Sequence, residues 1–340
     1  MFVSCTLVML PITILITIII SFNCVYSEEH HSTFSDIKVI SINAWLFPWQ
    51  FVALERDARL AAMIQFLLER DYDIVFMQEL WSLKDFKKIQ SLFPYSTIFG
   101  TPGNVFCGNI FFKQILNPLG CNGLAIFSRH SILSTNYLLF SDNINVIDER
   151  LVSRGVLSAT VLVKRSVDGV LKTDARVAAV DTHLASWYGD ELRHSSTREK
   201  QAEEVIKAAD MFFYSEAVDV IIVAGDLNSS PHSPVYNIFT SGGFTDTLVS
   251  RHGDNCDQYH HHTWGNTANT WSRPGGPQSD GYSTRLDYVF YKLMPHYGQV
   301  RSVDVVEHET VDPKIYKQSG NIFFSLSDHS LVETTIRLKF

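Results

Sequence analysis

The chain has 340 residues, 46% of them hydrophobic, and a formal net charge of -8. A chain of this length and apolar content can bury a large core as one or two domains. An acidic balance does not suit a general polyanion binder, which needs an excess of Lys and Arg to displace counterions. The composition therefore disfavours nucleic acid as a partner without excluding it.

The first 27 residues have the pattern of a secretory signal peptide. The segment 2–22 carries no charged residue, and Val25 and Ser27 place compact residues three and one positions before a cleavage point ahead of Glu28. The apolar run is also close to the roughly 20 residues that span a bilayer, so an uncleaved N-terminal membrane anchor is the alternative. We expect residues 1–27 to be the signal peptide of a secreted protein and residues 28–340 to form one folded domain.

Three of the five cysteines follow this leader, in a compartment where disulfides form. Cys107 and Cys121 flank a short segment rich in Gly, Asn, Pro and aromatic residues, and they are the expected bridge. Cys256 would then be unpaired.

Short β-rich runs alternate with a few amphipathic helical stretches along the chain. Leu60, Ile64 and Leu67 recur at helical spacing within 57–70. Ser196 with Glu199 has the form of a capping box that opens a helix to about residue 214. A further helix is predicted at 83–92, and strands are predicted at 37–42, 74–78, 124–127, 132–140, 155–163, 176–182, 218–224, 286–291, 299–306 and 331–338. Many strands with few helices predict an α/β fold of two packed mixed sheets with helices outside.

Two motifs far apart in the sequence carry polar side chains at strand ends. Gly225-Asp226-Leu227-Asn228 directly follows the apolar run 218–224, and Ser327-Asp328-His329 precedes the last predicted strand. The full set of strand-end polar residues is Asn43, Glu79, His183, Asp226, Asn228, Asp287, Asp328 and His329. Each alone has an ordinary structural explanation, such as an ion pair between Asp287 and Arg285. Together they form the inventory that phosphoryl hydrolysis needs.

The chemistry of these residue types suggests roles for them. A hard cation such as Mg²⁺ takes a few oxygen ligands and keeps several waters, so Glu79 helped by the Asn43 amide is a candidate metal site. His329 paired with Asp287 suits a general base, because a histidine held by a carboxylate can take a proton from water at neutral pH. The remaining residues, His183, Asp226 and Asn228, would surround the phosphate or protonate the leaving oxygen. Asn228-Ser229-Ser230 also matches a glycosylation sequon, and we predict that it is unmodified because a glycan would block the site.

The motifs resemble those of the endonuclease/exonuclease/phosphatase superfamily. The matching segments run in the same order through residues 40–45, 78–81, 181–184, 225–228, 285–289 and 327–329. The resemblance implies a four-layer α/β sandwich of the deoxyribonuclease-I type, with a catalytic domain at 28–340 that depends on Mg²⁺, Mn²⁺ being the alternative ion. It also implies that Glu79, Asn43 and Asp328 serve the metal, while the two histidines and the Asp226–Asn228 pair bind phosphate or supply the base.

Within the superfamily the chain looks most like the neutral sphingomyelinases. Asn43-Ala44-Trp45, the Trp81 two residues after Glu79, and the aromatic-bearing run 182–188 carry this likeness. It implies a phosphodiesterase of phospholipase C type that cleaves sphingomyelin in membranes to ceramide and phosphocholine, with no protein partner inferred. Exposed aromatic side chains would touch the lipid, and the candidates are Trp187, Tyr188, Phe106, Phe111, Phe112, Trp264 and Trp271. Arg154 could meet the phosphate, with an exposed ion pair as the alternative.

Other functions remain open on the sequence alone. A secreted deoxyribonuclease-like endonuclease would use the same residues, and Arg and Lys spread beside the cleft would favour it over a lipid enzyme. A catalytically silent binding module is a further alternative, although every catalytic residue type stands at its motif position. A phosphoinositide phosphatase is a weaker choice, because the sequence has no concentrated basic patch.

Overall fold

The computed structural model describes residues 34–47, 53–98, 122–141, 154–167, 170–186, 192–254, 261–294, 298–317 and 322–340. The strands of the first sheet are β1 Phe34–Asn43, β2 Ile74–Gln78, β3 Tyr95–Ile98, β4 Ala125–Ser128, β11 Ser302–Val311 and β14 Leu331–Lys339. The strands of the second sheet are β5 Ser131–Leu139, β6 Gly155–Val167, β7 Val170–His183, β8 Val220–Asp226, β9 Thr245–Asp246 and β10 Asp287–Leu293. Within the described ranges, a separate pair is formed by β12 Lys314–Lys317 and β13 Ile322–Ser325.

Both large sheets are mixed. The first has the strand order β11-β14-β1-β2-β4-β3, and the second has the order β5-β6-β7-β8-β10-β9. In each sheet one central pair is parallel, β1 with β2 and β7 with β8, whereas β14 and β10 run antiparallel to their neighbours β1 and β8. This arrangement brings the ends of β1, β2, β7 and β8 to the same edge as the starts of β10 and β14.

The two sheets pack face to face. Because successive side chains of a strand point to opposite faces, each strand also faces the helices on its other side. Ile37 and Val39 of β1 meet Ile222 of β8 in the core between the sheets. Ile40 and Ile42 of β1 point the other way, into a second core under the helices. Alternate apolar residues of one strand thus fill the core between the sheets and the core under the helices.

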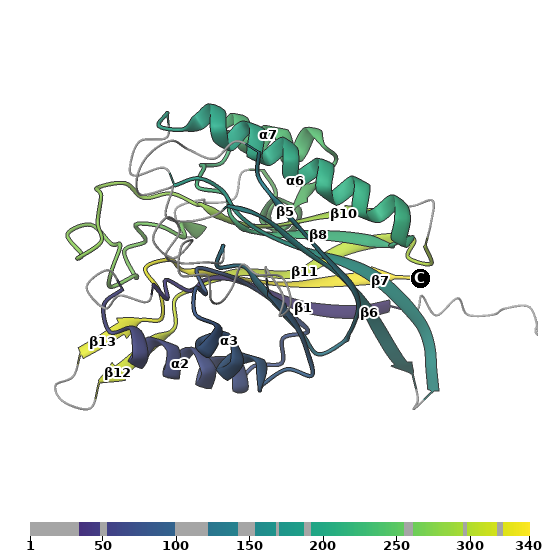
Figure 1. The fold of residues 1–340 in the computed structure, drawn as a ribbon, viewed down its shortest axis with the longest axis horizontal. Helices are drawn as coiled ribbons and strands as arrows, with labels where there is room; N and C mark the ends of the chain where they lie inside the picture. Colours follow the sequence, from purple (N-terminus) through teal and green to yellow (C-terminus); the bar gives the residue numbers. More distant parts are fainter. Residues whose placement is uncertain are drawn as a thin grey trace, which may run out of the picture.

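Helices cover the outer faces of both sheets (Figure 1). The helices α2 Arg56–Leu68 and α3 Leu83–Gln90 pack on the first sheet, and α6 Ser195–Glu216 and α7 Pro234–Ser241 pack on the second. A short helix, α8 Thr247–His252, follows β9. The predicted four-layer α/β sandwich is confirmed.

Most predicted elements are present, but the short ones were missed. β3, α7, β9, α8, β12 and β13 have two to eight residues each, too few for a periodic pattern to stand out. The capping box predicted at Ser196 is wrong: the helix begins at Ser195, and the Ser195 hydroxyl donates to Glu199 at 2.7 Å. Its N-cap is His194, which has a left-handed φ of 62° and makes no side-chain capping bond.

Several predictions fall outside the described residues. These are the leader 1–27, all three non-leader cysteines, Cys107, Cys121 and Cys256, and the aromatic residues Phe106, Phe111, Phe112, Trp187 and Tyr188. In the ranges that the structure describes, no helix has the length and apolar character to cross a membrane.

Candidate active site

The topology brings the polar strand ends to one edge of the sandwich. Asn43, His183 and Asp226 are the last residues of β1, β7 and β8, and Glu79 directly follows β2. Asp287 opens β10 and pairs in register with Asp226, while His329 lies just before β14, which starts beside the end of β1. Residues that are up to 286 positions apart, from Asn43 to His329, therefore share one site.

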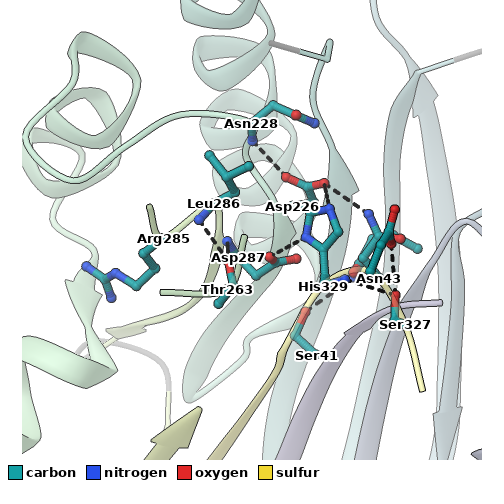
Figure 2. Close-up of polar contacts among 12 residues, drawn as sticks. Ser41, Asn43, Asp226, Asn228, Thr263, Arg285, Leu286, Asp287, Ser327 and His329 are labelled. Carbon is teal, nitrogen blue, oxygen red and sulfur yellow. Dashed lines mark hydrogen bonds and ion pairs between the residues drawn. The ribbon is translucent and has the colours of Figure 1, made fainter. Parts of the chain in front are cut away.

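Asp226 is the centre of this site, and Figure 2 shows the side chains around it. Its Oδ2 accepts from the Asn43 Nδ2 at 3.0 Å and lies 3.3 Å from the His183 Nε2, and its Oδ1 accepts from the Asn228 backbone N–H at 2.8 Å. Burial opposes ionisation of Asp226, but His183 and His329 outweigh burial and lower its pKa below the ordinary value. Asp226 is thus a carboxylate, charged and fully buried.

His329 lies between two carboxylates (Figure 2). Its Nδ1 is 2.7 Å from the Asp287 Oδ2, and its Nε2 is 3.8 Å from the Asp226 Oδ2. An Nδ1–H that donates to Asp287 leaves the Nε2 facing the site. Burial would lower the pKa of His329, but Asp287 and Asp226 raise it well above the ordinary value.

Asp287 is held in place by a hydrogen bond from its backbone N–H as well as by the bond between its side chain and His329. The Thr263 Oγ1 accepts from the N–H groups of Leu286 and Asp287 at 2.9 and 3.0 Å, which fixes the start of β10 (Figure 2). The pKa of Asp287 is raised by burial and by Asp226, in opposition to His329. The hydrogen bond between Asp287 and His329 is therefore buried, with both side chains almost fully enclosed.

Glu79 and Asp328 lie on the other side of Asn43. The Glu79 Oε1 accepts from the Asn43 Nδ2 at 3.3 Å, and the Glu79 backbone has a left-handed φ of 56°. Gly123 permits that turn, since a Cβ there would stand 3.1 Å from the Glu79 Cα. Burial and the charge of Glu79 raise the pKa of Asp328 to about 7, against the lowering effects of His329 and Arg59.

The negative charge of Glu79 opposes the ionisation of Asp328, and a cation bound beside both groups would relieve this repulsion. Glu79 is partly exposed, so water can complete a coordination shell there. These oxygen donors suit Mg²⁺, which keeps several waters and is held by one or two carboxylates. Glu79, Asn43 and Asp328 thus fit the ion that the sequence predicts.

A second group of donors is closer packed. Asp226, Asp287 and His329 are the described residues whose metal-binding atoms all lie within 4.8 Å of one another. The Asp287–His329 hydrogen bond and the donors on Asp226 already occupy much of this group. We interpret it as a proton-transfer and phosphate-facing group, because Mg²⁺ prefers oxygen donors to imidazole.

Comparison with known proteins identifies the family. The model of the "Endonuclease/Exonuclease/phosphatase family" matches residues 40–329, which is most of the chain. The chain belongs to this family. The matched segment contains all eight strand-end residues on which the sequence prediction rests.

The curated relatives are named as enzymes that act on lipids. The chain is 26% identical to an inositol phosphosphingolipids phospholipase C of Schizosaccharomyces pombe over 89% of this chain and 69% of that protein. It is 29% identical to a putative neutral sphingomyelinase of Caenorhabditis elegans over 57% of this chain and 42% of that protein, and 23% identical to one of Drosophila melanogaster over 89% and 61%. The chain thus spans between 42 and 69% of the length of these relatives.

Solved structures share the fold at lower identity. A beta toxin of Staphylococcus aureus with bound magnesium ions has a TM-score of 0.59 and 17% identity, covering 88% of this chain and 99% of its own. A TDP2 of D. rerio in complex with a single-strand DNA product has a TM-score of 0.59 and 18% identity, covering 89% and 99%. The sphingomyelinase C of Streptomyces griseocarneus has a TM-score of 0.57 and 15% identity, covering 88% and 99%. The solved structures with this fold therefore include one named as a sphingomyelinase and one named as a complex with DNA.

Arg59 supports the site from α2, a role that was not predicted from the sequence. Its side chain is fully buried in α2 and donates to the carbonyls of Leu54, Ala44, Trp45 and Leu326 at 2.6 to 3.0 Å. One guanidinium thereby joins the loop after β1 to the segment that leads into Asp328. A signal existed: Arg59 shares the apolar stripe of its helix with Met63 and Phe66, four and seven positions later.

A polar bridge between the sheets lies directly beneath the site. The Gln78 Nε2 at the end of β2 donates to the Asp181 Oδ1 on β7 at 2.7 Å. Asp181 is fully buried, and burial raises its pKa well above the ordinary value against the bonds from Gln78 and nearby backbone. Among the residues that the structure describes, the Gln78 Oε1 and the Asp181 Oδ2 are both buried without a hydrogen-bonding partner.

The segment that carries Asp328 is fixed by a loop that the sequence left as a long connection. The Asn269 Nδ2 donates to the Ser327 carbonyl at 3.0 Å, and the Ser272 hydroxyl donates to the Asp328 carbonyl at 2.6 Å. Trp264 from the same connection lies with its ring 5.0 Å from that of His329. Short polar residues in a loop gave no sign in the sequence that they face the site.

Two alternatives from the sequence are settled by the contacts. Arg285 pairs with Asp246 at 2.6 Å rather than with Asp287, so the ordinary explanation of Asp287 is wrong. Arg154 is not an exposed ion pair: it is buried, donates to the Ser186 Oγ at 2.8 Å, and precedes Gly155, which pairs in register with His183.

The structure also bears on the expected lipid contact at Trp271 and on the expected absence of a glycan at Asn228. Trp271 is wrong as a lipid contact, because it is 4% exposed and packs on Trp45 and Phe324. Asn228 is buried and its Nδ2 donates to the Leu184 carbonyl at 3.1 Å, which supports the prediction that it carries no glycan. Trp187 and Tyr188 lie outside the described residues.

Proposed function

We propose that this family member is a Mg²⁺-dependent phosphodiesterase of phospholipase C type, which hydrolyses sphingomyelin to ceramide and phosphocholine. The observation that carries the chemistry is the position of His329 between Asp287 and Asp226. The observation that carries the substrate is the likeness to relatives named as phosphosphingolipid and sphingomyelin enzymes.

In the proposed reaction His329 acts as the general base. Its Nδ1–H stays with Asp287 at 2.7 Å, and its Nε2 takes a proton from the attacking water. The water oxygen forms a bond to phosphorus while the bond from phosphorus to the ceramide oxygen breaks. Asp287 keeps the ring in one orientation and stabilises the imidazolium that results.

His183, Asp226 and Asn228 would surround the phosphate. The His183 Nε2 lies 3.3 Å from the Asp226 Oδ2. The Asn228 backbone N–H donates to the Asp226 Oδ1 at 2.8 Å and its Nδ2 donates to the Leu184 carbonyl at 3.1 Å, so both residues are held in place before substrate binds. The proton for the ceramide oxygen would come from this group. A bound Mg²⁺ at Glu79, Asn43 and Asp328 supplies positive charge that polarises the phosphoryl oxygen, offsets the charge on the departing alkoxide and opposes the carboxylates that raise the pKa of His329.

Location and membrane contact complete the proposal. Secretion through the leader 1–27 would place the enzyme at the outer face of a membrane. Aromatic residues near the site, Trp187, Tyr188 and Trp264, would meet the lipid surface. Arg154, which precedes the Gly155 partner of His183, would lie near the phosphate.

The test is the release of phosphocholine from sphingomyelin vesicles by the purified mature chain, first with Mg²⁺ and then with EDTA. Plasmid DNA and vesicles of an inositol phosphosphingolipid are assayed in parallel, because one relative is named for the inositol headgroup. We expect metal-dependent phosphocholine release and intact DNA. Nicked DNA with untouched lipid would show that the same site acts as a nuclease. Hydrolysis of the inositol phosphosphingolipid alone would show that the substrate carries an inositol headgroup in place of phosphocholine.

A further inference from the structure

A cluster of three histidines lies apart from the residues proposed for catalysis. His252 ends α8, His308 lies within β11, and His261 comes from the connection between α8 and β10. Their ring centroids are 5.3 Å (His252–His261), 6.0 Å (His261–His308) and 6.4 Å (His252–His308) apart. Three imidazoles from three segments thus face one another.

His308 has a ring nitrogen that calls for a ligand. The Thr247 hydroxyl donates its only proton to the Val289 carbonyl at 2.8 Å, so at 2.9 Å it must accept from the His308 Nδ1–H. The His308 Nε2 therefore carries a lone pair, and within the described part of the chain this atom is buried without a hydrogen-bonding partner, in a side chain that is 3% exposed. Burial, Arg285 and the two neighbouring histidines lower the pKa of His308 well below its ordinary value, so the ring stays neutral.

A hydroxyl or carbonyl that receives one ring N–H while the other nitrogen faces a partner is the usual setting of a metal-bound histidine. His252 has the same arrangement: its Nε2 donates to the His308 carbonyl at 3.2 Å, which leaves the lone pair on Nδ1. His261 has its Nδ1 3.5 Å from the Thr310 Oγ1. Each ring thus has a second partner that could orient it.

The spacing suits a tetrahedral ion after a small movement. With nitrogens about 2.0–2.1 Å from the metal, three ligating rings would have centroids roughly 5 Å apart. The observed separations exceed this by about an ångström or less on two sides, and His252 is exposed and can turn. Among the described residues only the Asp226 group has all its donor atoms within 4.8 Å, so the histidine rings must rotate to close around an ion.

We propose that His252, His261 and His308 bind a transition-metal ion of the zinc class, with water as the fourth ligand. Imidazole suits Zn²⁺ and its neighbours in the transition series and does not suit Mg²⁺, so this site and the carboxylate site select different ions. Arg285 adds positive charge nearby, but its buried pair with Asp246 offsets that charge. The proposal is independent of the substrate.

The ion would fix a segment that reaches the candidate active site. His261 is two residues before Thr263, which holds the start of β10 at Asp287, and three before Trp264, whose ring lies against His329. A metal that joins His261 to α8 and β11 would therefore order residues 261–264. Its predicted role is to position these two side chains, not to enter the reaction.

The test uses the full mature chain, freed of metal and then kept in excess Mg²⁺ so that the carboxylate site is filled. Co²⁺ is titrated as the spectroscopic probe, followed by displacement with Zn²⁺. We expect a visible absorption band of tetrahedral Co²⁺ that Zn²⁺ removes, and slower hydrogen exchange of residues 261–264 with Zn²⁺.

The variants locate the ion. His252→Gln, at an exposed helix end, should lose the band and the slowed exchange, and Thr247→Val should weaken affinity about 10- to 100-fold by releasing the His308 ring. His130→Gln is the matched control, because His130 pairs with Asp73 elsewhere. No Co²⁺ band in the wild-type chain, or equal binding by His252→Gln, would overturn the proposal. A band kept by His252→Gln and lost in Asp226→Asn would place the ion at the carboxylates instead and overturn it too.

Discussion

The two sheets build the candidate active site in different ways. The second sheet supplies His183, Asp226 and Asp287 as strand residues, and the register alone places Asp226 opposite Asp287 and beside His183. The first sheet supplies Asn43 from the end of β1, but it supplies Glu79 and the Asp328–His329 pair from segments just beyond its strands. Their positions depend on bonds from buried side chains to backbone carbonyls.

This difference indicates where the site is rigid and where it depends on distant residues. Backbone ladders hold the second-sheet half, so only a change in a reacting side chain should affect it strongly. Arg59, Asn269 and Ser272 hold the first-sheet half through the carbonyls of residues 44, 45, 326, 327 and 328. Substitutions in these supports should therefore reduce stability and activity together.

The largest expected effects are at Asp226, which the second sheet supplies, and at His329, which the first sheet supplies. Asp226→Asn removes the charge that faces both histidines, and His329→Gln removes the base; each should lower kcat by about 10²- to 10⁴-fold. The measurement is phosphocholine release under saturating Mg²⁺, with thermal unfolding as the control for folding. Wild-type turnover in both variants would contradict the roles assigned here.

Glu79→Gln tests the first-sheet side. Loss of one of the carboxylates that suit the ion should raise the Mg²⁺ concentration for half-maximal activity about 10- to 100-fold, because an amide oxygen binds a hard cation more weakly. Asp226→Asn should leave that concentration unchanged while lowering the maximum. If both substitutions shift the Mg²⁺ dependence equally, the two halves of the site do not have separate roles.

Arg59→Met should reduce stability and activity together. It leaves four buried carbonyls without their donor, and we expect a loss of about 2–4 kcal/mol in the free energy of unfolding. Denaturant unfolding measures this. Arg129→Met, which removes an exposed pair with Asp71, is the control and should cost about 0–1 kcal/mol.

Thr263→Val sharpens the comparison at the start of β10. The valine keeps the shape but cannot accept from the N–H groups of Leu286 and Asp287, so Asp287 should hold His329 less well and kcat should fall about tenfold. Thr263→Ser keeps the oxygen and should keep most of the activity. Equal activity in the two variants would exclude this positioning role.

The bridge beneath the site gives a pH-dependent effect on stability. Asp181 has a folded pKa raised above its ordinary value of 3.8, so the folded state keeps a proton that the unfolded chain releases as the pH rises. The contribution of Asp181 to wild-type stability should therefore fall from pH 3.8 upward, by up to about 1.4 kcal/mol per pH unit, until the folded pKa is passed. Asp181→Asn removes this fall, and its stability relative to wild type should increase with pH in urea unfolding series.

Much of the fold was predictable because its strands and long helices carry regular apolar patterns. β1, β2, β8 and β14 and the helices α2, α3 and α6 lie where the sequence predicts them, within a few residues at each end. The elements that the sequence missed, such as β3 and α8, are short and depend on their neighbours for stability. Arg59 was missed because a single charged residue in an apolar stripe does not show what it will contact.

The sequence by itself determined which residues gather at the site, because each follows or precedes a buried strand and the strand ends share one edge. Only the tertiary structure decided their partners: Arg285 went to Asp246, Asp287 to His329, and Arg59 to carbonyls from segments far apart in the chain. It also brought His252, His261 and His308 together from α8, β11 and the connection between them. The physical reason is that local patterns set which face of an element is buried, whereas hydrogen-bond partners depend on which buried polar groups meet once the layers have packed.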